Sequence, residues 1–318
     1  MLLLLTFLAS VTVADSTDMH IYTEGGEPVA IEAIVAAFGD ADVVFIGETH
    51  DDSLAHVLQF ELLQAAAAGS RPVTLSLEMF ARDEQLVLDE YLAGTIRDRD
   101  LKLDTRIWNN YDSDYGPMVD FAKENRMPVV AANAPRRYVS LVGREGVGIL
   151  DSLGAHVDPW LPPRPYPAAS PAYEQAFMDI MAEMMHGMPP AQPNSVSADS
   201  AEATAAATPA AESAPPAHPP MPGLDRMLAA QNLWDATMGY SIASHLETAA
   251  EDALVLHLVG SFHVKNRLGT PEHLARYAPE ARQLVVVVVP VDDPAAFDPD
   301  AHAGIGDFVV LTRTTSTP

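Results

Sequence analysis

Two short segments of the chain place a histidine three residues after a glycine. GETH at 47–50 and GSFH at 260–263 each follow a run of β-branched and aliphatic residues that is typical of a buried strand. Glycine permits a tight turn out of the strand, so the histidine can face the space beyond it. Glu78 and Asn133 follow two further runs of the same kind. The sequence therefore predicts polar side chains at the ends of four strands.

These residue types suit two kinds of chemistry. Two histidines with one or two carboxylates are a sufficient donor set for Zn²⁺, or for Mn²⁺ or Fe²⁺ with open positions. The same groups also serve acid–base catalysis without a metal. The set consists of Glu48, His50, Glu78 and His263. A structural role is the alternative for each of them, since Glu78 could instead cap a helix or pair with Arg82.

The order of strand-like and helix-like segments predicts an α/β fold, with a largely parallel central sheet flanked by helices. We expect strands at 43–46, 72–77, 127–132, 254–259 and 284–289, and a strand at 308–311 that closes one edge of the sheet. Helices are expected at 53–68, 82–92, 115–125 and 224–246. Because the carboxyl ends of parallel strands meet at one edge, the four polar ends converge if their strands are neighbours.

The regular alternation breaks between the third and fourth strands, where we expect a helical insertion at about 155–250. It contains a Met-rich helix over 173–188 and an Ala/Pro-rich stretch at 189–222 whose composition is typical of a flexible loop. Residues 1–14 are apolar and end in small residues, which predicts a secretory signal peptide before a single domain over 15–318. The protein is therefore expected to be exported to the periplasm or cell envelope.

Composition narrows the functions further. The formal net charge is −26, from 44 acidic and 18 basic residues, which argues against binding to nucleic acid. The chain has no cysteine, so disulfides, thiolate metal sites and catalytic cysteines are excluded. The same absence leaves no cysteine to acylate as a lipid anchor, and we expect a soluble mature protein.

Several other residues are assigned from their position. Arg136 follows the third strand and is a candidate for binding a carboxylate. Aromatic residues before the helix at 115–125 are expected mainly to pack against the sheet; they are Trp108, Tyr111 and Tyr115. Four further histidines have no carboxylate in register and are expected to be structural; they are His56, His245, His257 and His273.

Specific blocks of the sequence include VVFIGETHDD, LSLEMFARDEQLVLDEYLAGTI, PVVAANAPRRYVSLVGREG and HLVGSFHVKNRLGTPEHL. Together they resemble the ChaN-like haem-binding uptake family, within the superfamily of Tiki proteases, TraB proteins and erythromycin esterases. The resemblance runs from about 40 to 290. It implies haem binding at or near the outer membrane or periplasm, by a homodimer with haem at its interface. An outer-membrane haem transport system is the implied partner.

The resemblance also implies that a tyrosine binds the haem iron with assistance from a histidine. We expect this site in the insertion, with Tyr173 and Tyr166 as candidate ligands and His186 as the second group. Arg136, after the third strand, is a further candidate for binding the haem. From metal-dependent members of the superfamily, Glu48, His50, Glu78 and His263 carry over as a candidate metal or catalytic set.

Three functions stay open on the sequence. One is a haem-binding protein of uptake or storage. Another is a metal-dependent hydrolase of the protease or esterase type, in which Glu48 or Glu78 is the general base. The third is a scaffold that keeps these residues for structure alone.

Overall fold

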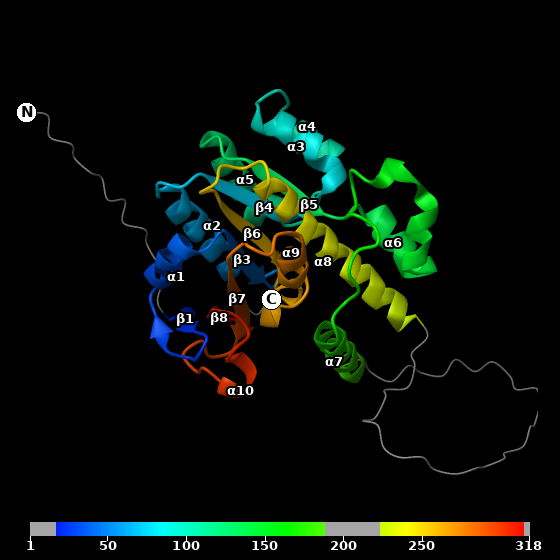
Figure 1. The fold of residues 1–318 in the computed structure, drawn as a ribbon. Coiled ribbons are helices and arrows are strands. Elements are labelled where there is room, and N and C mark those ends of the chain that lie inside the picture. Colours follow the sequence, from blue (N-terminus) through cyan, green and yellow to red (C-terminus); the bar gives the residue numbers. More distant parts are fainter. Residues whose placement is uncertain (1–16, 188–222, 315–318) are drawn as a thin grey trace, which may run out of the picture.

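The computed structural model describes residues 17–187 and 223–314. These residues build an α/β fold around an eight-stranded sheet in the order β2-β1-β8-β7-β3-β6-β4-β5 (Figure 1). Neighbours from β8 to β5 are parallel, whereas β1 pairs antiparallel with both β8 and β2. The strands are β1 (Met19–Thr23), β2 (Pro28–Val29), β3 (Val43–Glu48), β4 (Val73–Ala81), β5 (Val129–Asn133), β6 (Leu254–Gly260), β7 (Gln283–Val291) and β8 (Phe308–Arg313).

The five central strands predicted from the sequence are confirmed, and one expectation about the edge is wrong. Residues 308–311 do form a strand, but β8 lies between β7 and β1 and does not close the sheet. The edge beyond β8 consists of β1 and β2, and the sequence analysis predicted neither strand. Their residues alternate only weakly between apolar and polar, and β2 has two residues.

Helices cover both faces of the sheet. Leu58 of α2 and Met118 of α5 belong to the hydrophobic core on one face, and Met238 of α8 and Leu274 of α9 belong to the core on the other. Because both faces are covered, β3 and β6 are buried along their whole length. The α-helices are α1 (Ile31–Ala37), α2 (Ser53–Ala67), α3 (Gln85–Leu92), α4 (Asp98–Asp104), α5 (Gly116–Glu124), α6 (Arg136–Glu145), α7 (Pro171–Gly187), α8 (Leu224–Leu246), α9 (Thr270–Tyr277) and α10 (Pro299–His302).

Short turns of other helix types join these elements. A π-helical turn, η3 (Tyr111–Tyr115), leads directly into α5. The 3-10 turns are η1 (Phe38–Asp40), η2 (Arg82–Glu84), η4 (Val147–Leu153), η5 (Ala155–Val157), η6 (Ser261–His263) and η7 (Lys265–Arg267).

The region predicted as a helical insertion has two structural roles. Its last helix, α8, packs on the sheet through Met238 and Ile242 and so forms part of the layer that covers this face. Leu161 and Leu233 of this region also form a smaller core with Val139 of α6 and Leu150 of η4, which precede the insertion. The predicted loop at 189–222 and the predicted signal peptide at 1–14 lie outside the described residues.

No helix in the described parts of the chain is long and apolar enough to span a membrane.

Because α8 packs tightly against α9, we expect alanine substitutions at two glycines to change the stability of the protein in opposite directions. A Cβ on Gly239 would lie 2.8 Å from His273 Cβ and 2.8 Å from the backbone nitrogen of Leu274. Gly239→Ala should therefore force the two helices apart and lower the free energy of unfolding by about 1–3 kcal/mol. A Cβ on Gly143 in α6 would meet nothing closer than Ala230 Cβ at 3.9 Å. Gly143→Ala should raise the free energy of unfolding by about 0.5–1 kcal/mol.

Urea denaturation followed by circular dichroism measures both changes. Equal stability of the Gly239→Ala and wild-type proteins would show that α8 and α9 are not in the close contact described here.

Candidate functional site

The polar ends of β3, β6, β4 and β5 lie side by side because these four strands are neighbours in the sheet. His50, Glu78, Asn133 and His263 all line one pocket of about 1030 Å³ at this edge. Pockets of this size hold drug-sized ligands and cofactors. The structure therefore brings four of the predicted strand-end residues into one site. Glu48 does not line the pocket but lies behind it.

Glu48 is 2% exposed, and four side chains surround its carboxylate. Gln59 Nε2 donates to Oε2 at 2.5 Å, and His56 Nδ1 lies 3.2 Å from the same oxygen. The Tyr115 hydroxyl donates to Oε1, which also lies 3.0 Å from His50 Nδ1. Burial alone would raise the pKa of Glu48, but the hydrogen bonds outweigh burial and lower the pKa to about 2. Glu48 is therefore a buried anion near neutral pH.

This anion orients His50. Because Nδ1 faces Glu48, the opposite edge of the ring carries a free Nε2, which no described residue hydrogen-bonds. The side chain is 45% exposed, and the ring meets Trp108 edge-on with centroids 4.6 Å apart. A Cβ on Gly260 would lie 2.9 Å from Cε1 and 3.1 Å from Nε2 of His50, so the ring would have to shift if this residue carried a side chain. Burial lowers the pKa of His50, but Glu48 and Glu78 outweigh it and raise the pKa above its ordinary value.

A second carboxylate orients His263 from the other side of the sheet. Its Nδ1 lies 2.8 Å from Oδ1 of Asp235, a fully buried residue of α8. Asp235 also accepts hydrogen bonds from the Thr270 and Tyr173 hydroxyls. The Nε2 of His263 lies 3.7 Å from Glu78 Oε1. Burial lowers the pKa of His263, but Asp235 and Glu78 outweigh it and raise the pKa to about 9.

Glu78 contacts His263 and acts on His50 through its charge. Its Oε2 accepts a hydrogen bond from the Gly260 backbone N–H at 2.7 Å, and its Oε1 faces His263. The sequence alternatives for Glu78, a helix cap or a pair with Arg82, are not what the structure shows. Arg82 instead donates to the Ser241 hydroxyl and to the carbonyl of Pro159.

The residues expected to hold haem do not all lie at the strand-end pocket. Tyr173 is 1% exposed, and its hydroxyl is bound to Asp235. The Tyr166 hydroxyl is buried without a hydrogen-bond partner among the described residues, and neither tyrosine lines the strand-end pocket. The side chain of His186, in α7, lies outside the described part of the chain. Arg136 does line the pocket.

Sequence reasoning missed much of the support around the two histidines. It placed His56 among the structural histidines, but His56 contacts Glu48 through Nδ1 and the His50 carbonyl through Nε2, at 3.2 Å each. Tyr115 binds Glu48 and Trp108 lines the pocket, so packing against the sheet is not their only role. No spacing in the chain could reveal Asp235, because it lies on a helix far from both strand-end motifs.

The other three histidines in this group bond to neutral side chains. Their partners are Thr74 for His245, Ser76 for His257 and Asn232 for His273. A structural role therefore accounts for these three.

The four residues of the candidate metal set do not form a single metal-binding site in the described structure. Each histidine presents Nδ1 to its own carboxylate, and Glu48 is fully occupied by its donors. Across residues 17–187 and 223–314, no group of three or more His, Asp or Glu side chains is arranged to hold a metal ion. The expected divalent metal therefore has no support in the described residues.

Aromatic, cationic and amide side chains complete the pocket. Trp108 and Trp234 line it, and Trp234 meets His263 edge-on as Trp108 meets His50. Arg106 and Arg136 are exposed in the same pocket. Gln231 also lines it, and its buried Oε1 has no hydrogen-bond partner among the described residues. A buried unpaired oxygen indicates that a donor from a ligand or a water reaches it.

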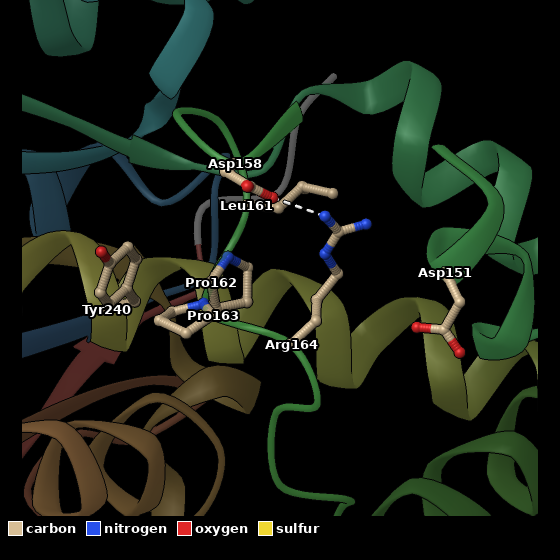
Figure 2. A pocket seen from close by; sticks show the side chains of 7 residues that line it. All are labelled: Asp151, Asp158, Leu161, Pro162, Pro163, Arg164 and Tyr240. Atoms are coloured by element: carbon tan, nitrogen blue, oxygen red, sulfur yellow. Dashed lines mark hydrogen bonds and ion pairs between the residues drawn. The ribbon is translucent and has the colours of Figure 1, made fainter. Parts of the chain in front are cut away.

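A smaller pocket of about 500 Å³ lies between α8 and the segment 151–164 (Figure 2). Its Arg164 is already bound to Asp158 and to the carbonyls of Leu150 and Gly154. It contains no histidine and no strand-end residue. We therefore place the candidate site in the larger pocket.

The fold and this pocket define an α/β protein that presents two carboxylate-oriented histidines at the carboxyl edge of a parallel sheet. The sequence model of the family "Haem-binding uptake, Tiki superfamily, ChaN" matches residues 34–274, and the chain belongs to this family. The resemblance seen in the sequence blocks is thereby confirmed.

Comparison with solved structures agrees with this fold in one case. A structure entitled "Cofacial heme binding to ChaN of Campylobacter jejuni" aligns with a TM-score of 0.64 at 18% identity, over 93% of this chain and 98% of that one. A mutant of the erythromycin esterase EreC in its open conformation aligns with a TM-score of 0.46 at 12% identity, over 93% of this chain and 83% of that one. No curated protein sequence matches the chain.

The Asp235–His263 pair predicts a defined dependence on pH. The raised pKa of His263 means that its contribution to stability is fully present below its ordinary pKa of 6.5 and is lost as the pH rises through about 9. Asp235→Asn should bring the His263 pKa well below 9 and remove roughly 2–4 kcal/mol of this contribution.

NMR titration of the His263 ring measures the pKa, and urea denaturation at about pH 6 and pH 9.5 measures the stability. Asp225→Asn changes an exposed acid in the first turn of the same helix and is the control. An unchanged His263 pKa in the Asp235→Asn protein would refute the pairing.

Proposed function

We propose that the protein binds haem in the strand-end pocket and serves haem uptake or storage. The observation that carries this proposal is the orientation of His50, whose Nδ1 is held by Glu48 while Nε2 stays free. A histidine that donates its Nδ1–H to a carboxylate is oriented and made more basic as a ligand through Nε2. If haem binds here, Nε2 of His50 would be the nitrogen that holds its iron.

The walls of the pocket suit the rest of the haem molecule. Trp108 and Trp234 offer flat apolar surfaces for the macrocycle. Arg136, the one residue of the expected haem set that lines this pocket, is placed to pair with a propionate. The volume of about 1030 Å³ is large enough for a cofactor of this class. Membership of a family described by haem binding supports the same ligand.

This proposal places the iron on His50 in preference to the tyrosines. A tyrosine binds ferric iron as phenolate, and burial together with Asp235 raises the pKa of Tyr173. Binding iron would also require the Tyr173 hydroxyl to leave Asp235. Burial likewise raises the pKa of Tyr166, which lies outside the pocket lining.

The proposal extends to compartment and partners. Export to the periplasm or cell envelope follows from the signal-peptide pattern of residues 1–14. A homodimer and an outer-membrane haem transport system are proposed from the family resemblance alone.

Haemin titration of the chain from residue 15 onward tests the ligand. We expect a saturable Soret shift at about one haem per chain. His50→Ala should weaken binding at least tenfold and change the spectrum, because the axial ligand is lost. Tyr173→Phe and Tyr166→Phe should leave the Soret band in place.

His245→Ala is the matched control, since His245 is bound to Thr74 and is absent from the pocket. An unchanged spectrum in His50→Ala together with a lost Soret shift in either tyrosine variant would return the site to the insertion. No shift in the wild-type protein would refute haem binding itself.

A second candidate, hydrolysis, is favoured by the contact between His263 and Glu78. A histidine oriented by Asp235 and facing a second carboxylate is a suitable acid–base pair for attack by water on an ester or amide. Glu78, which lines the pocket, replaces Glu48 as the candidate base, because Glu48 is enclosed.

Chromogenic ester and peptide substrates test this second function. We expect Glu78→Gln to reduce any turnover at least a hundredfold. His257→Gln, at a buried histidine outside the pocket, is the control. Turnover that survives Glu78→Gln would exclude this assignment.

A further inference from the structure

We propose that Arg106 and Arg136 determine the specificity of the strand-end pocket, selecting a flat ligand that carries two carboxylates whether or not it carries iron. This inference rests on the proposed function, because it names the ligand class of the same pocket.

The first observation is that both guanidinium groups are unpaired. Neither forms a salt bridge or hydrogen bond with any residue in the described parts of the chain, although the protein has 44 acidic and 18 basic residues. Some other arginines of the described chain, such as Arg282 with Asp42, are held in ion pairs. Arg144 also forms no ion pair with a described residue, but only Arg106 and Arg136 of these unpaired arginines line the pocket. Two unpaired guanidinium groups in one pocket of so acidic a protein point to an anionic partner from outside.

The second observation is that three of the pocket's four carboxylates are engaged within the protein; the fourth, Asp51, forms no hydrogen bond or ion pair with a described residue. Asp83 is paired with Arg137, and Glu78 accepts from the Gly260 backbone N–H. Glu84 accepts from the backbone N–H groups of Ala81 and Arg106. Glu84 therefore anchors the main chain of Arg106. Burial raises the pKa of Glu84 and the charge of Arg106 opposes that rise, but the guanidinium forms no ion pair with Glu84 and can still bind a ligand.

The backbone of each arginine is held in place by the fold. Arg136 is the first residue of α6, directly after β5, and the main chain at Arg106 is fixed by Glu84 at 2.7 Å. Planar guanidinium groups bind carboxylates through two parallel hydrogen bonds, which fixes the ligand's orientation as well as its charge. Binding of the ligand's carboxylates by the two arginines therefore does not depend on iron.

The other residues that line the pocket indicate the chemistry of the uncharged part of the ligand. Trp108 and Trp234 favour a planar aromatic ring system. The unpaired Oε1 of Gln231 can accept from a ligand N–H or O–H. A tetrapyrrole with two propionates meets all of these requirements, and so does its metal-free form.

Three probes separate the contributions: haemin, metal-free protoporphyrin IX and the dimethyl ester of protoporphyrin IX. Binding is followed by absorption for haemin and by fluorescence of the porphyrin for the other two. We expect the metal-free diacid to bind within about tenfold of haemin and the dimethyl ester to bind at least tenfold more weakly. Arg106→Gln and Arg136→Gln should each weaken the diacid about tenfold, and the double variant should bind diacid and ester alike.

Arg144→Gln is the matched control, because Arg144 is exposed on the same helix as Arg136 and does not line the pocket. It should behave as the wild type does. Failure of wild-type protein to bind haemin refutes the proposed function. Haemin binding combined with equal affinity for diacid and ester, or with full discrimination in the double variant, refutes only the role of the two arginines.

Discussion

Glu48 is a buried carboxylate at the end of the central strand β3. Such a group needs hydrogen-bond donors around it, and the fold must supply them. A buried charge without partners would cost far more than the stability of a domain tolerates. Its donors come from three elements: the turn after β3, helix α2 and the π-helical turn η3. Satisfying Glu48 therefore fixes the loop that carries His50 against the helices of one face. The orientation of His50 follows from this requirement.

Asp235 imposes the same constraint from the opposite face of the sheet. It is fully buried on α8, and its oxygens take donors from His263, from Thr270 at the start of α9 and from Tyr173 in α7. Gly269, with a φ of +66°, lets the chain pass so close that a Cβ would lie 2.8 Å from Asp235 Oδ1. Each face of the sheet thus contributes one buried acid, and each acid holds one histidine at the same edge.

The sequence predicts the parts of this site that depend on local pattern. Continuous apolar runs identify β3, β4, β5 and β6, and the residues just after them lie at one edge as soon as the strands are neighbours. The buried supports could not be predicted in this way. His56 and Tyr115 occupy ordinary amphipathic positions, and their contact with Glu48 depends on how α2 and η3 pack. The edge strand β1 is held by pairing with β8, near the opposite end of the chain, and β2 is held by pairing with β1, so no short window of sequence contains the contacts that define this edge.

A histidine held by a buried carboxylate suits either metal ligation or proton transfer, so the two pairs do not by themselves choose between binding and catalysis. The two rings differ in exposure and in their neighbours, and this difference suits them to different tasks. His50 is half-exposed beside Trp108 with a free Nε2, whereas His263 is buried and turns its Nε2 toward Glu78. A group that needs an accessible nitrogen can reach only the first. The Nε2 of the second lies 3.7 Å from Glu78, an arrangement that suits proton transfer better than ligation.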